Sequence, residues 1–135
     1  MAGCFNSPAI MRMEKQQYCT TRKQEAELAE MGINPDTADL YRIPMVGGYR
    51  ITSEWSNNAV PCWSLAALLS LLPLTLKDED GIVYDRCIFG EEVTYFCIDY
   101  DLHLESFDGG TLFENIIGCV KWLKQNSDKY ESGGK

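Results

Sequence analysis

A cysteine at the start of an apolar segment and a histidine further along the chain are the residues best suited to chemistry. Cys62 directly precedes residues 63–72, which are apolar on nearly every side and predict a short buried helix. The amino end of a helix favours a thiolate, and a nearby imidazole could act as its base. Cys62 and His103, the single histidine, are therefore candidates for the nucleophile and base of a thiol hydrolase.

This pair resembles, in outline only, the catalytic centre of papain-type cysteine peptidases. No Gly-Ser pair precedes Cys62, Pro61 stands directly before it, and no glutamine lies just upstream to form an oxyanion hole. We therefore expect Cys62 to be a small residue at a helix start and His103 to be a strand residue that faces solvent. A small thiol hydrolase stays as an alternative function.

Carboxylates crowd the middle of the chain and offer a second kind of site. Residues 77–114 contain eleven acidic residues and only two basic ones. The candidates for a binding face are the carboxylates of Asp78, Glu79, Asp80, Glu91, Glu92, Asp99 and Asp101. We expect mainly a solvated surface, and the sharper alternative is a surface for a basic protein partner. A nucleic-acid mimic directed against host defence would use the same acid-rich face.

Neither a metal nor a cofactor is expected. Residues 78–81 lack the alternating oxygen ligands and the closing glutamate of an EF-hand loop, and no Cys-x-x-Cys pair gives the spacing of a structural zinc site. The glycine pairs at 47–48 and 109–110 occur without the flanking residues of a phosphate-binding loop.

Composition limits the class of protein. The chain has 135 residues, of which 45% are hydrophobic and 24% charged, as is ordinary for one globular domain. Its net charge of −8 disfavours direct binding to nucleic acid. The longest apolar stretch, residues 65–76, is too short to span a membrane, and no export signal is evident. We therefore expect a cytoplasmic protein that makes no membrane contact and keeps its six cysteines reduced.

Helix caps and hydrophobic periodicity predict the elements that would position these residues. A capping-box pattern marks two helix starts, at Thr21 and at Thr111. The expected elements are helices at 21–31, 63–72 and 111–125, an irregular hairpin or edge strand at 41–51, a β-hairpin at 82–89 and 93–100, and a strand at 102–107. The fold class is therefore α+β, with an antiparallel sheet of three to five strands covered by two or three helices.

One α+β domain is expected, over residues 20–126. Residues 1–19 show no sustained hydrophobic period and are predicted to form an irregular segment. Residues 127–135 are polar, end in Ser-Gly-Gly-Lys and are predicted to form a disordered tail.

Three segments together carry a resemblance to other proteins. They are Glu-Leu-Ala-Glu-Met-Gly-Ile-Asn-Pro-Asp-Thr-Ala-Asp-Leu at 27–40, Val-Pro-Cys-Trp-Ser-Leu-Ala-Ala-Leu-Leu-Ser-Leu-Leu-Pro at 60–73, and Val-Lys-Trp-Leu at 120–123. With these segments in this order, the chain resembles a group of small proteins, with no assigned activity, from bacteriophages, prophages and mobile elements of gut anaerobes. The most specific parts are the Thr-Ala-Asp step at 37–39 and the Trp-Ser-Leu helix start at 63–65, which we interpret as structural. The resemblance implies a mobile-element origin and transfers no site.

The favoured function is a non-enzymatic protein-binding or accessory module of phage or mobile-element origin, acting through an unidentified protein partner. The incomplete catalytic signatures, the acidic middle and the resemblance all favour it. The alternatives are the thiol hydrolase at Cys62 and His103 and the acidic nucleic-acid mimic. A structural subunit that self-associates through a sheet edge or through exposed aromatic side chains, giving a homo-oligomer, is a third class of function.

Overall fold

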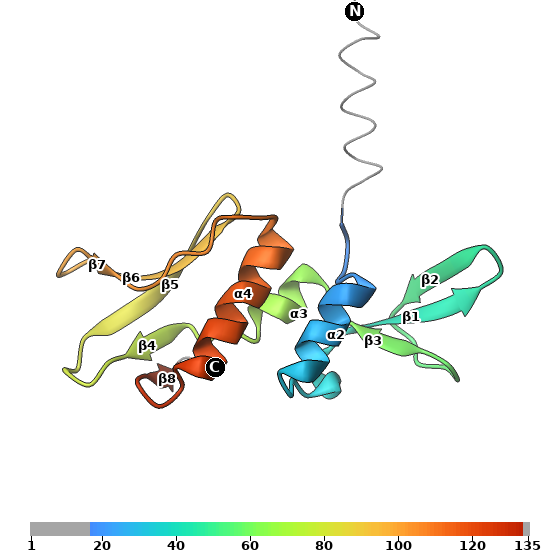
Figure 1. The fold of residues 1–135 in the computed structure, drawn as a ribbon, viewed down its shortest axis with the longest axis horizontal. Helices are drawn as coiled ribbons and strands as arrows, with labels where there is room; N and C mark the ends of the chain where they lie inside the picture. Colours follow the sequence, from blue (N-terminus) through green and yellow to red (C-terminus); the bar gives the residue numbers. More distant parts are fainter. Residues whose placement is uncertain (1–16, 134–135) are drawn as a thin grey trace, which may run out of the picture.

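The chain folds into two antiparallel β-sheets and the helices that join and cover them. The computed structural model describes residues 17–133 and contains, within that range, three α-helices, a short 3₁₀ helix and eight strands (Figure 1). The helices are α2 (Arg22–Glu30), α3 (Leu65–Leu69) and α4 (Leu112–Gln125), with the 3₁₀ helix η1 at Pro35–Thr37. The strands are β1 (Leu40–Met45), β2 (Gly48–Thr52), β3 (Val60–Cys62), β4 (Thr75–Lys77), β5 (Val83–Phe89), β6 (Glu92–Cys97), β7 (Leu102–His103) and β8 (Glu131–Gly133).

The strands form a three-stranded sheet of order β2-β1-β3 and a five-stranded sheet of order β7-β6-β5-β4-β8. All neighbouring strands in both sheets are antiparallel. The predicted α+β class is confirmed. The strands form two sheets, however, whereas a single sheet was expected.

Local capping signals set the ends of the longer helices. The Thr21 hydroxyl accepts from the backbone N–H of Gln24, whose side chain accepts in return from the Thr21 N–H, so the predicted capping box is present. The box predicted at Thr111 begins α4 in the same way. α2 ends before Gly32, which has a φ of +76°, the left-handed geometry that glycine adopts without strain.

The two segments most specific to the resemblance bind one another. The indole N–H of Trp63 donates to the Thr37 hydroxyl at 3.0 Å, and the backbone N–H of Ser64 donates to Asp39 Oδ1 at 2.9 Å. Ser64 also caps α3, which therefore begins two residues later than expected. Both segments thus make structural contacts.

The five-stranded sheet contains the predicted hairpin and two strands that local sequence did not predict. β5 and β6 pair as expected, but β6 ends early because residues 98–101 form the turn to β7. β4 and β8 extend the sheet beyond β5. The expectation of a disordered tail is wrong over residues 131–133, which form β8. Residues 134–135, and residues 1–16 of the predicted irregular segment, lie outside the described range.

The three-stranded sheet is more regular than the predicted irregular hairpin or edge strand. β1 and β2 join through a two-residue turn in which Gly47 has a φ of +81°, and β1 is the central strand. Pro44 is tolerated there because β3 pairs only with residues 40–42, so no neighbouring strand needs the N–H that proline lacks. This sheet forms one end of the molecule (Figure 1).

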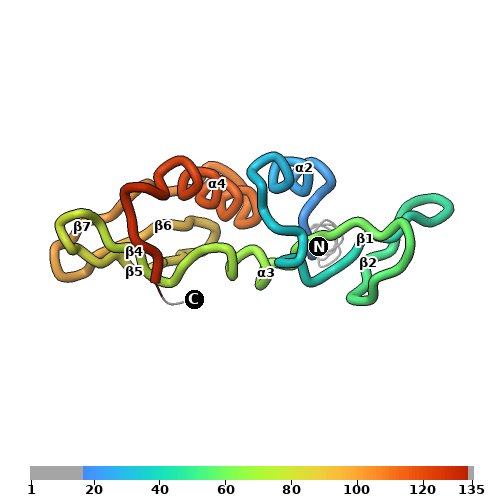
Figure 2. The backbone as a smooth tube through the Cα atoms, turned by 90° about the horizontal axis from the view of Figure 1, so that it is seen from below, coloured from blue at the N-terminus to red at the C-terminus, as the bar shows by residue number. Residues whose placement is uncertain are grey.

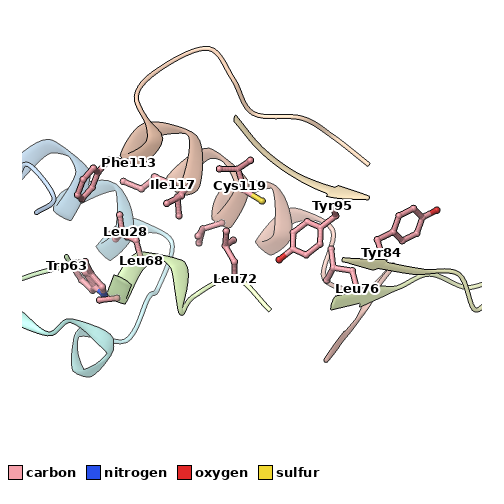
Figure 3. Close-up of a cluster of buried hydrophobic side chains, with 14 of the residues drawn as sticks. Leu28, Trp63, Leu68, Leu72, Leu76, Tyr84, Tyr95, Phe113, Ile117 and Cys119 are labelled. Carbon is pink, nitrogen blue, oxygen red and sulfur yellow. The ribbon is translucent and has the colours of Figure 1, made fainter. Parts of the chain in front are cut away.

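The hydrophobic core lies between α4 and the five-stranded sheet and continues under α2 and α3 (Figures 2 and 3). Tyr95 and Leu76 from the sheet, Ile116 from α4 and Leu28 from α2 are each at most 1% exposed. Within residues 17–133, no member of this core cluster comes from β1, β2 or β3. The three-stranded sheet must therefore be held to the rest of the molecule mainly by other contacts.

Candidate functional site

Cys62 and His103 lie far apart. Cys62 ends β3 and His103 ends β7, and these two strands lie at opposite ends of the molecule (Figure 1). Cys62 is fully buried. This burial is the main reason that the pKa of its thiol rises to about 12, and the neighbouring Cys19 is the second reason. His103 is exposed, as expected of a strand residue facing solvent. The predicted nucleophile and base therefore share no site.

The acidic side chains divide between the two ends of the five-stranded sheet. The turns at 78–81 and 98–101 lie at one end, because β4, β5, β6 and β7 alternate in direction. Glu91 and Glu92 lie at the β5–β6 turn, at the opposite end. The predicted carboxylates that the fold gathers at one end are Asp78, Glu79, Asp80, Asp99 and Asp101.

Part of that acidic end is used by the fold itself. Asp78 Oδ1 accepts the backbone N–H groups of Asp80 and Ile82, both at 2.9 Å, and Oδ2 accepts the Tyr84 hydroxyl at 3.1 Å.

Across residues 17–133, no group of three or more His, Cys, Asp or Glu side chains is placed to hold a metal ion. No helix of that part of the chain is long and apolar enough to cross a membrane.

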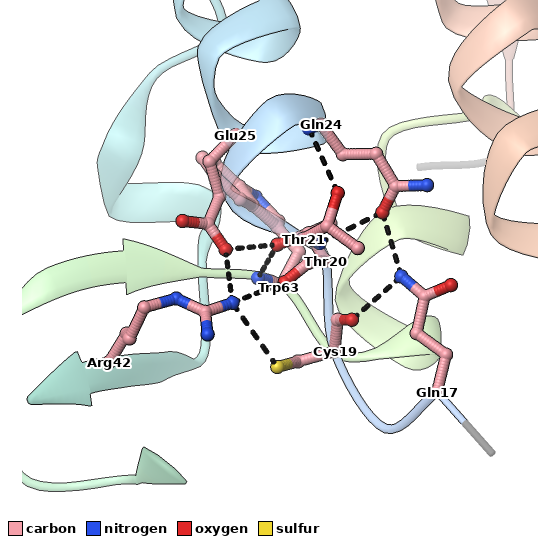
Figure 4. A network of polar contacts seen from close by, with 8 residues as sticks. All are labelled: Gln17, Cys19, Thr20, Thr21, Gln24, Glu25, Arg42 and Trp63. Atoms are coloured by element: carbon pink, nitrogen blue, oxygen red, sulfur yellow. Dashed lines mark hydrogen bonds and ion pairs between the residues drawn. The ribbon is translucent and has the colours of Figure 1, made fainter. Parts of the chain in front are cut away.

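Arg42 joins the three-stranded sheet to α2 (Figure 4). It lies in the central strand β1 and is only 5% exposed. Its Nη2 donates to Glu25 Oε2 at 2.9 Å and to the Thr20 carbonyl at 2.6 Å. The buried Thr20 hydroxyl donates to the same Glu25 oxygen and accepts the backbone N–H of Trp63, each at 3.0 Å. This polar cluster connects β1, α2 and the segment that follows β3.

Charge and an aromatic ring compensate the burial of Arg42. Burial alone would lower the pKa of its guanidinium, but the hydrogen bond and the charge of Glu25 outweigh it and raise that pKa, so the group stays charged. The guanidinium carbon lies 4.1 Å from the centre of the Tyr49 ring, a cation–π contact. Because removing one partner of a buried ion pair leaves the other charge buried without compensation, loss of either residue alone is expected to weaken the attachment of the sheet.

The outer part of the three-stranded sheet exposes apolar and aromatic side chains. Met45, Val46 and Tyr49 surround the β1–β2 turn, and Trp55 lies in the loop that leads to β3. Their exposed fractions are 54% for Met45, 107% for Val46, 58% for Tyr49 and 66% for Trp55. We call Met45, Val46 and Tyr49 the apolar tip. Trp55 lies beyond the end of β2 that is farther from the β1–β2 turn, because Thr52 pairs with Tyr41. Exposed apolar side chains such as those of the apolar tip are the kind of surface that proteins use for contacts.

No protein-family model, curated protein or solved structure matches the chain. Function has to be argued from the geometry of the site itself.

Sequence reasoning missed both Arg42 and Glu25. Arg42 did carry a signal, because it is the one charged residue in the otherwise apolar β1 sequence Leu-Tyr-Arg-Ile-Pro-Met. A charged side chain is seldom buried unless it is paired, so a lone charge in such a strand indicates a buried partner. Glu25 carried no signal, since it is one of several charged residues in α2.

Proposed function

We propose that the protein is a non-enzymatic binding module that contacts a protein partner through the apolar tip of its three-stranded sheet. One observation carries the proposal: this sheet supplies no residue to the core cluster of the described chain, yet it exposes large apolar side chains at its end. Tyr49 contacts Arg42 within the fold, but core packing does not account for the exposure of Met45 and Val46, whereas a protein contact would bury them. Aromatic and methionine side chains are enriched at the centres of such contacts.

The outer edge of β2 can bind a strand of the partner. Within residues 17–133, β2 pairs only with β1. In a hairpin with a two-residue turn the pair that flanks the turn is hydrogen bonded, and bonded pairs alternate along the strands. The backbone groups of Tyr49 and Ile51 consequently point away from β1, toward the open edge. An extended segment of the partner adds there as a further strand, with its apolar side chains against the apolar tip.

The test compares partner capture by the wild-type chain and by two variants, Val46→Asp at the tip and Ile98→Asp as the control. Ile98 is 77% exposed in the turn at the other end of the molecule, so this change also replaces an exposed apolar side chain with a charge. We expect a partner that binds the wild-type and Ile98→Asp chains with equal affinity and binds Val46→Asp at least about tenfold more weakly. Equal binding by all three chains, or repeated failure to capture any protein, contradicts the proposal.

Self-association through the same edge is the main competing use of the surface. Light scattering distinguishes the two: a dimer that Val46→Asp converts to a monomer identifies a second copy of the chain as the occupant, whereas a monomer throughout favours a different protein.

The acidic mimic predicts instead that binding weakens steeply with salt and is lost on charge reversal at Glu79 and Asp99. The phage or mobile-element origin stays a prediction from the resemblance.

A further inference from the structure

Two free cysteines lie in neighbouring segments at the base of the three-stranded sheet. Cys19 lies just before α2 and Cys62 ends β3, and both are buried. The residues that follow them are held together: the N–H of Thr20 donates to the Trp63 carbonyl at 2.9 Å, and the N–H of Trp63 donates to the Thr20 hydroxyl at 3.0 Å. Cys19 and Cys62 each directly precede one of these two hydrogen-bonded residues. Segments 43 positions apart in sequence thus bring a cysteine pair together.

The two cysteine residues differ in exposure. Cys62 is 0% exposed, whereas Cys19 is 8% exposed and lines a cavity of about 320 Å³ together with Arg42 and Tyr49. The nearest guanidinium nitrogen, Nη2 of Arg42, lies 4.0 Å from Cys19 Sγ. A reagent in the cavity therefore reaches Cys19 first and finds Cys62 beside it. This is the arrangement of an attacking cysteine and a resolving cysteine.

We propose that Cys19 and Cys62 form a redox-active dithiol that a low-molecular-mass disulfide converts to an intramolecular disulfide. The Cys19 sulfur attacks the S–S bond of the reagent, so that a mixed disulfide forms and one reagent thiol leaves with the Cys19 proton. The Cys62 sulfur then attacks the Cys19 sulfur, the bond to the reagent breaks, and the second reagent thiol leaves with the Cys62 proton. The two protein thiols lose two electrons and the reagent disulfide is reduced to two thiols.

The new bond would tie β3 to the segment that begins α2. The Arg42 cluster already connects these elements through charge and hydrogen bonds. A covalent link adds a connection that does not depend on charge and restricts the unfolded chain as well. Oxidation is therefore expected to hold the three-stranded sheet more firmly against the rest of the molecule.

The test treats the full chain with a graded excess of oxidised glutathione, blocks remaining thiols with an alkylating reagent, and maps the peptides by mass spectrometry. The expected product has lost about 2 Da and yields a peptide that links Cys19 to Cys62. It also melts at a higher temperature than the reduced chain, and a reductant reverses the shift. If the linked peptide is absent while the half-buried Cys87 gains glutathione, the proposal is overturned.

Two single substitutions serve as matched variants. In Cys62→Ser the reaction should stop at a glutathione adduct on Cys19, because the resolving sulfur is missing. Cys87→Ser should form the same link as the wild-type chain, since Cys87 lies in β5 of the other sheet. A Cys62→Ser chain that folds and gains no adduct at Cys19 contradicts the proposed order of attack. If that variant does not fold, the peptide map of the wild-type chain decides alone.

Discussion

Replacement of Glu25 by Ala should destabilise the protein through the guanidinium that it leaves unpaired. The side chains of Arg42 and Glu25 are 6% and 8% exposed, and their charged atoms lie 2.9 Å apart. Removing one partner of a buried ion pair typically costs about 3–5 kcal/mol. Arg42 would keep its 2.6 Å hydrogen bond to the Thr20 carbonyl and its contact with the Tyr49 ring. We therefore expect a loss near the lower limit, about 3 kcal/mol in the free energy of unfolding.

Urea denaturation followed by far-UV circular dichroism measures this loss, and hydrogen exchange shows where it occurs. Because the three-stranded sheet contributes nothing to the core cluster of the described chain, amide exchange should rise mainly in β1, β2 and β3. The amides of α4, which packs on the five-stranded sheet, should be affected far less.

Two further variants control the experiment. Glu30→Ala removes an exposed carboxylate from the same helix and should change stability by less than about 0.5 kcal/mol. The double variant Glu25→Leu with Arg42→Met removes both charges and should recover most of the loss, since no charge is left buried without a partner. A loss below about 1 kcal/mol for Glu25→Ala, or exchange that rises equally in α4, would refute the reasoning.

Three more predictions concern the body of the molecule. Gly32→Ala should cost about 1 kcal/mol in urea denaturation, because the φ of +76° strains any other residue even though the space around it is open. Tyr130→Ala should remove the ring that lies 5.5 Å from that of Trp122, and so lower the melting temperature and alter tryptophan fluorescence. Burial raises the pKa of Cys119 from 9.0 to about 12 in the folded chain. The stability that this shift contributes is fully present below about pH 9 and is lost as the pH rises toward 12, so Cys119→Ala should flatten the fall in melting temperature over that interval.

The sequence predicted best those features that depend on neighbouring residues. The capping boxes at Thr21 and Thr111 involve side chains three positions apart, and both helices begin where these boxes predict. β8 could not be predicted in this way, because Glu-Ser-Gly has little intrinsic preference for a strand and pairs only once β4 is in place. Its ordering follows from tertiary contacts.

The candidate site was harder to predict than the fold. The ion pair of Arg42 and Glu25 joins residues 17 positions apart on a strand and a helix, so no local pattern connects them. Cys62 was predicted at a helix start, but Trp63 and Ser64 make contacts with the segment before β1 that delay the helix and leave Cys62 at the end of β3. The acidic residues are close together in sequence, whereas the alternation of strand direction places them at two ends of a sheet.

The separation of the three-stranded sheet from the core has a consequence for how this protein can evolve. Substitutions at sites that share no neighbours change stability independently of one another. A change at Val46, which is fully exposed, should therefore leave the stability of the core formed by α4 and the five-stranded sheet unchanged, and under the proposed function it would alter partner binding. Val46 can accordingly vary in sequence while Gly47, with its φ of +81°, stays fixed, and the β1–β2 turn is a suitable position for grafting a foreign recognition loop onto an otherwise unchanged chain.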